Sequence, residues 1–482
     1  MYNKALPPAP TRVSQYGVDP KYVVKRGAEL KNIVGVPLTD LVTGLPPVIF
    51  PGGSNDVAVI RKETEAALAK VDMSKITAGS TVNILASHHG FTFYGGQPYA
   101  EMLRTIKDVV EQRTGCKEVR LRAGLGMRFR ETEEYIKAHG LDEYFNGKAL
   151  GIAPIDAGIP IETELGTLFG LKKAYDADFI IHAHNSDVRE VHFHRQVDRA
   201  VKPFGMSYAR CETRSTYHMN LGPRAANFVA RSIFESEFVQ KKFAFACFLT
   251  MSPAGATGVD ADTDLYALND RVTVGGMRDY GKIMTLFGAI DECIAVLDFP
   301  CPVPYVFACG VIYANMACAN MDVFDLDYPL PPYTWYTETM YDDHGKPLIP
   351  EVPPVNPVIK TVVHNYAWVG YPSVFFAEKS PTIVVGKQQA ELFDRDPMNL
   401  NYMKHALLAD NLDGAMDFAY HTTGTRKVIL FDGAASGLNV SEPLAEHLYK
   451  VAPGVMERVE QKLLPKWLAQ RNVDPSLLDQ VA

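Results

Sequence analysis

The sequence predicts an α/β protein with two α/β domains, whose sheets are mainly parallel and carry helices on both faces. Segments that suit strands lie at 81–87, 119–124 and 178–184, and the first of them is a short apolar run typical of a buried parallel strand. They alternate with segments of helical spacing, which lie at 54–71, 99–114 and 131–139. Strands that alternate with helices in this way build a parallel sheet covered on both faces. The length of 482 residues exceeds one ordinary core and indicates more than one domain.

We expect an N-terminal α/β domain over 1–270 and a C-terminal α/β domain over 271–425, with the active site in the cleft between them. A closing strand and a helical tail are expected over 426–482. The second domain carries an insertion rich in proline and aromatic residues at 328–357, in which Pro-Pro pairs exclude regular helix. It is interpreted as a surface loop or lid that stacks on a ring-shaped substrate, or as packing between domains.

Composition narrows the classes of partner. The net charge is −8 and the isoelectric point is about 5.9. Nucleic acid and anionic membranes both need a basic protein surface, so neither is expected as the main binding partner. The N-terminus has no apolar signal segment, and the seven cysteines are scattered without a C-x-x-C pair. We therefore expect a cytoplasmic protein with reduced thiols and a small-molecule partner, and leave the oligomeric state open.

Histidines are concentrated in one part of the chain, since eight of thirteen lie between residues 88 and 218. They include one adjacent pair and two His-x-His pairs, namely His88-His89, His182-Ala-His184 and His192-Phe-His194. Residues i and i+2 of a strand share a face, so such a pair can present two imidazoles to one metal or substrate. Any single histidine is equally well interpreted as a hydrogen-bonded structural residue.

A short motif marks the end of each of the three predicted strands. These motifs are Ser87-His-His-Gly, Gly124-Leu-Gly-Met-Arg and His182-Ala-His-Asn. Ligands of parallel sheets bind beyond the carboxyl ends of the strands, so the three motifs are expected to converge. Lys202 follows further along the chain, where a lone lysine is usually solvated. Arginines among these loops are candidates to clamp a carboxylate or phosphate.

Three places carry a resemblance to a known family. The first is the pair of strand–loop–helix units at 84–89 and 120–134. The second is the series His192, Lys202 and His218, with spacings of ten and sixteen residues. The third is the helix and strand at 411–433. With these features the chain resembles the nickel-pincer lactate racemase family, which includes other 2-hydroxy-acid racemases and epimerases.

The resemblance implies a lysine-tethered cofactor. Lys202 would form a thioamide bond to a pyridinium mononucleotide that carries sulfur groups, and nickel would be held by sulfur, ring carbon, sulfur and His218. Such a soft square-planar site suits nickel. This nickel-pincer nucleotide would take a hydride from a carbinol carbon and return it to the other face, which implies a racemase or epimerase. His192 is the candidate acid/base. Ser87 and Arg128 are assigned to cofactor binding.

The chain departs from the family at the second catalytic histidine, whose place is taken by Met127, just before Arg128. In the first loop, His88 and Phe91 stand where the family has an aspartate and an arginine. Methionine cannot move a proton, so we expect His88 or His89 to take over, or the substrate to differ. The substrate classes that follow are a 2-hydroxy acid, a sugar, a polyol or a sugar acid.

Two other functions remain open from the sequence. The pair His182-Ala-His184 resembles the opening metal pair of zinc-dependent hydrolases, which predicts zinc and no adduct on lysine. A non-catalytic homologue that binds a sugar or sugar acid predicts an unmodified Lys202 and no nickel.

Overall fold

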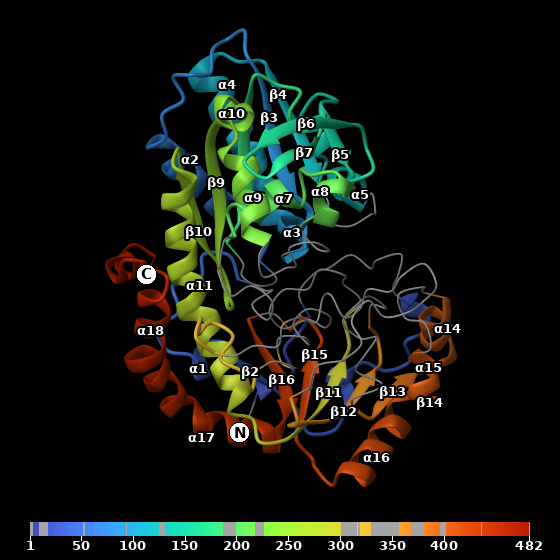
Figure 1. Cartoon of the computed structure of the whole chain (residues 1–482). Helices are drawn as coiled ribbons and strands as arrows, with labels where there is room; N and C mark the ends of the chain where they lie inside the picture. The colour runs from blue at the N-terminus through green and yellow to red at the C-terminus, as the bar shows by residue number, and fades with distance from the viewer. Residues whose placement is uncertain are drawn as a thin grey trace. The chain divides into compact units, whose positions relative to one another are not determined.

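The computed structural model describes residues 3–8, 18–51, 54–92, 94–124, 131–186, 199–216, 226–299, 316, 319–328, 356–367, 380–395, 402–434 and 436–481 (Figure 1). The chain divides into two compact units. Unit 1 comprises 1–45, 188–195 and 277–475, and unit 2 comprises 46–187, 196–276 and 476–482. The boundary at 276/277 falls within one helix, α11 (Leu265–Gly288). The domain limits and the cleft expected from the sequence stay predictions.

Unit 2 contains a mixed sheet in which, among the described residues, all strands but one run parallel. Its order is β10-β9-β8-β3-β4-β5, and only β10 pairs antiparallel with its neighbour. The three strands expected from the sequence all form, as β3, β4 and β8, side by side in the middle of this sheet. The strand bounds are β3 Thr81–Ser87, β4 Glu118–Gly124, β5 Ala149–Ile152, β8 Phe179–Asn185, β9 Phe243–Ser252 and β10 Gly255–Asp262, with a separate hairpin of β6 Gly158–Thr163 and β7 Gly166–Leu171.

The expected helices of unit 2 also form, with shifted ends. The longest of them before α11 is α4 (Gln97–Thr114), which begins after Gly96 and ends at Gly115, both in the left-handed region that glycine tolerates best. Helical segments of this unit are α2 Ala58–Ala69, α3 His88–Phe91, η3 Tyr94–Gly96, α5 Glu131–Ala138, α6 Leu141–Tyr144, α7 Lys202–Gly205, α8 Cys211–Ser215, α9 Ala226–Glu235 and α10 Glu237–Lys242.

Unit 1 contains a second mixed sheet, whose described strands have the order β1-β2-β16-β15-β11-β12-β13-β14. The stretch from β15 to β14 is parallel, and β16, β2 and β1 add antiparallel pairs. Both units are therefore α/β, as the sequence predicts. The strand bounds are β1 Asn3–Lys4, β2 Ile33–Pro37, β11 Cys293–Leu297, β12 Ile359–His364, β13 Thr382–Val385, β14 Leu407–Ala409, β15 Val428–Phe431 and β16 Gly437–Ser441.

The helical tail of unit 1 contains Pro465, a residue type that does not fit the interior of an uninterrupted helix. After α17 (Glu442–Arg458) comes a π-helical turn, η8 (Val459–Leu463), and α18 (Leu464–Ala469) restarts with Pro465 in its first turn. Proline lacks an N–H, so it is tolerated at such a start. Other helical segments of this unit are η1 Pro20–Tyr22, η2 Gly27–Glu29, α1 Leu38–Leu41, α14 Lys387–Arg395, α15 Tyr402–His405 and α16 Leu412–Thr423. The last helical segment of the chain, η9 Pro475–Gln480, falls in unit 2 except for its first residue.

Among the helices that the structure describes, none is both long and apolar enough to cross a membrane. Nearly all of the insertion at 328–357 lies outside the described residues, so its interpretation as a lid or as packing stays a prediction.

Candidate functional site

The motifs at the ends of β3, β4 and β8 meet at one edge of the unit 2 sheet. Strands β3 and β4 pair in parallel with Ser87 opposite Gly124, and β3 pairs with β8 with Leu85 opposite His182. Because all three strands run the same way, their carboxyl ends lie side by side. The expected convergence is therefore confirmed for the motif residues that the structure describes.

The segment that carries Lys202 is anchored to this same edge. The hydroxyl oxygens of Ser207 and Ser87 lie 3.2 Å apart, and the Tyr208 hydroxyl oxygen lies 3.1 Å from the Leu85 carbonyl oxygen. At the end of β4, a Cβ on Gly124 would lie 2.3 Å from the Ser207 carbonyl oxygen. Only glycine lets the two backbones approach so closely, so this residue positions the 199–208 segment over the strand ends.

Lys202 begins the short helix α7 and is 9 % exposed. Its neighbours Ala200, Val201 and Phe204 are fully buried in the hydrophobic core of unit 2. Burial removes the water that stabilises an ammonium ion, so a buried lysine is more readily available as the neutral amine. The partly desolvated surroundings expected for a modified lysine are therefore present.

Four imidazoles form a connected row at the sheet edge. Ring centroids lie 4.6 Å apart between His88 and His89, 6.1 Å between His89 and His184, and 5.7 Å between His184 and His182. His88, His182 and His184 are at most 1 % exposed, whereas His89 is half-buried. So many titratable side chains in one buried place are typical of a functional site.

His182 is held as a structural residue within this row. Its Nε2 lies 2.8 Å from the Ala200 carbonyl and its Nδ1 lies 3.0 Å from the Tyr208 hydroxyl. A carbonyl only accepts, so Nε2 carries the proton and Nδ1 accepts from the tyrosine. Burial lowers the pKa of His182 to about 3, which keeps the ring neutral. With both nitrogens bonded to protein, His182 has no lone pair for a metal, which argues against the zinc hydrolase.

His89 and His184 have defined tautomers. The Arg199 guanidinium lies 3.2 Å from Nδ1 of His89, and the Asn185 backbone N–H donates to Nδ1 of His184 at 2.7 Å. A guanidinium can only donate, so Nδ1 accepts in both rings and the proton of each neutral ring lies on Nε2. Arg199, 6 % exposed, also donates to the Asn185 side chain at 3.5 Å.

Ser87 makes contacts that account for it structurally. Its hydroxyl accepts from the His89 backbone N–H at 3.5 Å and so caps α3. Its own N–H donates to the Tyr99 hydroxyl, which donates to the Ala183 carbonyl at 2.8 Å and ties β3 to β8. The assignment of Ser87 to cofactor binding stays a prediction.

The other expected site residues, His192, His218 and Arg128, lie outside the described residues, as does Met127. Their roles stay predictions. Among the residues that the structure describes, no group of three or more His, Cys, Asp or Glu is placed to hold a metal ion.

Sequence reasoning missed Arg199, which the structure places against His89. A signal was present, because this arginine stands three residues before Lys202 in a stretch that is otherwise apolar. Arg122, by contrast, was a candidate anion clamp. Its guanidinium donates to the carbonyls of Leu121, Lys148 and Lys173, so it fastens loops within unit 2.

Comparison with known proteins gives a distant similarity at the level of structure alone. No family model matches the chain, and a search of curated proteins found no match. Among solved structures, the chain is similar to the lactate racemase apoprotein from Thermoanaerobacterium thermosaccharolyticum, at 12 % identity and a TM-score of 0.40, over 82 % of this chain and 94 % of that chain. A score of this size assigns neither family nor function.

Proposed function

We propose that the chain is an isomerase of the racemase or epimerase type that inverts a carbinol centre of a hydroxy acid or sugar-type substrate. It would work with a nickel-pincer nucleotide tethered to Lys202. The observation that carries the proposal is the burial of Lys202 on a segment fixed over the carboxyl ends of β3 and β4.

The residues at the sheet edge fit such a group. A tethered cofactor needs an amine that can lose its proton, and Lys202 is 9 % exposed. A tethered cofactor also needs a rigid support, which the contacts of Tyr208 with Leu85 and His182 provide. When bound, the cofactor supplies reversible acceptance of a hydride from the substrate carbon. His218 is proposed as the protein ligand of nickel, on the spacing of the sequence.

Proton handling falls to histidines in this proposal. His192 is proposed as the first acid/base, on sequence grounds. His89 is the better placed of the two candidates for the second, because it is half-buried whereas His88 is 1 % exposed. Its contact with Arg199 fixes the ring and leaves Nε2 as the nitrogen that carries the exchangeable proton. A general acid or base in such a position contributes about 10²- to 10⁴-fold to a rate.

The test is intact-protein mass spectrometry with nickel analysis on protein isolated from its native host, followed by peptide mapping around Lys202. We expect a covalent increment in the mass range of a mononucleotide on Lys202 and about one nickel per chain. Lys202→Ala should lose both, while Lys241→Ala, at a largely exposed lysine, should keep both. His192→Ala should keep the nickel and lose turnover.

Three outcomes would contradict the proposal. Full activity in Lys202→Ala would exclude the tether. An unmodified Lys202 with zinc bound would favour the hydrolase. An unmodified Lys202 without metal in protein from the native host would favour the binding protein.

A further inference from the structure

Unit 1 holds a cavity at the carboxyl edge of its own parallel strands. It has a volume of about 460 Å³, within the range of small-molecule sites, about 300–1,000 Å³. The residues that directly follow β12, β13 and β14 all line it, namely Asn365, Gly386 and Asp410. This is the position at which ligands of parallel α/β sheets bind.

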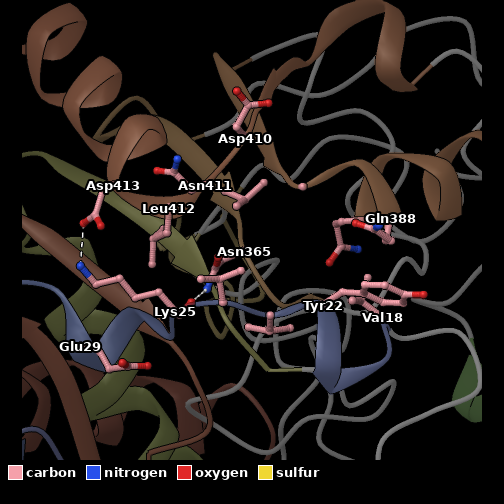
Figure 2. A pocket seen from close by; sticks show the side chains of 15 residues that line it. Val18, Tyr22, Lys25, Glu29, Asn365, Gln388, Asp410, Asn411, Leu412 and Asp413 are labelled. Atoms are coloured by element: carbon pink, nitrogen blue, oxygen red, sulfur yellow. Dashed lines mark hydrogen bonds and ion pairs between the residues drawn. The ribbon is translucent and has the colours of Figure 1, made fainter.

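The opposite wall is the N-terminal segment around Lys25, which buried polar contacts hold in place. The side-chain amide of Asn365, 6 % exposed, donates to the Lys25 carbonyl at 2.8 Å and to the Asp298 carboxylate at 2.8 Å. Asp298 in turn accepts from the Gly27 backbone N–H at 2.7 Å and from Arg26 at 3.0 Å. The wall is therefore built into the fold, as Figure 2 shows for Lys25 and Asn365.

The charge of the lining argues against an anionic ligand. Three carboxylates, those of Glu29, Asp410 and Asp413, face a single ammonium, that of Lys25, which gives a formal charge of −2. The ammonium is already paired, since Lys25 Nζ lies 2.6 Å from Asp413 (Figure 2). A phosphate or carboxylate entering here would meet net repulsion.

Two polar side chains of the lining are available to a ligand. Within the described part of the chain, neither Gln388 nor Asp410 makes a side-chain hydrogen bond or ion pair. The neighbouring Gln389 is already used, because its amide bonds the Ala367 backbone at 3.0 and 3.2 Å. An amide and a carboxylate complement hydroxyl groups, and Tyr22, 47 % exposed, places an aromatic ring near Gln388 (Figure 2).

We propose that this cavity binds a sugar ring through its hydroxyl groups, either as a free sugar or as the ribose of a nucleoside. Gln388 and Asp410 bond the hydroxyls, and Tyr22 packs against the ring. The site stands independently of the proposed isomerase activity, because none of its residues belongs to the edge that carries Lys202.

The test is ligand-observed NMR titration of the full-length protein with D-glucose, D-galactose and D-ribose in one arm, adenosine in a second and inorganic phosphate in a third. We expect saturable binding of at least one hydroxyl compound. Asp410→Asn and Gln388→Ala should each weaken it tenfold or more. Both side chains are exposed, so the variants should fold, which circular dichroism checks.

Two controls make the result specific. Asp417→Asn removes an exposed carboxylate of α16, the helix that follows Asp410; this side chain does not line the cavity, so the variant should bind as the wild type does. Lys202→Ala should also bind normally, which separates this site from the proposed function. Preference for adenosine over free sugars, lost in the same two variants, would identify a nucleoside as the source.

The proposal would be overturned by any of three results. These are no saturable binding of any hydroxyl compound up to tens of millimolar, binding of phosphate in preference to them, or equal binding by Asp410→Asn, Gln388→Ala and wild type.

Discussion

Replacing Gly124 with alanine should loosen the segment that carries Lys202. The new Cβ would lie 2.3 Å from the Ser207 carbonyl oxygen, and an ordinary contact needs about 3.4 Å, so the segment must move by about 1 Å. Overpacking of this kind costs about 1–3 kcal/mol. The movement also breaks the 3.2 Å contact between the Ser207 and Ser87 hydroxyls, worth about 1 kcal/mol. The expected cost is about 2–4 kcal/mol in total.

Hydrogen exchange read by mass spectrometry measures this cost locally. In peptides covering 199–210, exchange should accelerate about 30- to 1,000-fold, since 1.4 kcal/mol corresponds to a factor of ten. Acylation of Lys202 by an amine-reactive reagent should accelerate as well, relative to the 72 % exposed Lys241 of the same protein.

The matched control is Gly79→Ala, because a Cβ at that glycine meets no heavy atom within 4 Å. It should leave both rates unchanged. If Gly124→Ala behaved like Gly79→Ala, the close approach of Ser207 to β4 would be wrong, and with it the placement of Lys202 at the sheet edge.

Three further predictions concern single side chains. His89→Gln keeps an acceptor for Arg199 but has no side chain that can move a proton. Turnover measured by chiral chromatography should therefore fall about 10²- to 10⁴-fold at unchanged thermal stability. Turnover at the wild-type rate would exclude His89 from proton transfer. Tyr208→Phe leaves Nδ1 of the buried His182 without its donor, so the free energy of unfolding measured in urea should fall by about 1–3 kcal/mol. An unchanged free energy of unfolding would refute the structural role of that histidine. Burial raises the pKa of Asp432 to about 7, so the folded protein keeps a proton that the unfolded chain releases near pH 4. The contribution of this group to the free energy of unfolding is fully present below pH 4 and is lost as the pH rises through 7, by at most about 4 kcal/mol. Asp432→Asn should flatten the dependence of the unfolding free energy on pH. Equal slopes in the variant and the wild type would contradict this prediction.

The parallel core of unit 2 was predictable because its signal is local. Each of β3, β4 and β8 is a short segment with apolar residues that suit a buried strand, and such a pattern depends only on neighbours in the chain. Convergence of the strand ends then follows from the parallel arrangement alone. Helix ends were less predictable, since α4 begins two residues early, where Gly96 and Pro98 set its first turn.

The division of roles among the histidines was not predictable, because it depends on contacts across long stretches of chain. His182 is satisfied by Ala200 and Tyr208, eighteen and twenty-six residues further on, and His89 meets Arg199 after 110 residues. No periodicity in the sequence encodes such pairings. Gly124 shows the same limit, since the carbonyl that requires a glycine there belongs to Ser207, a residue distant in the chain.

His182 and Lys202 are both buried in unit 2, but apolar packing accounts for them to different degrees. A buried histidine with both nitrogens bonded stabilises the fold by joining β8 to the 199–208 segment, and its burial needs no other explanation. A lysine at 9 % exposure differs, because leucine or methionine would fill the same space in the core around Phe204 without any cost of desolvating an ammonium ion. Apolar packing alone therefore does not account for Lys202, and the proposed tether at its amine would account for it.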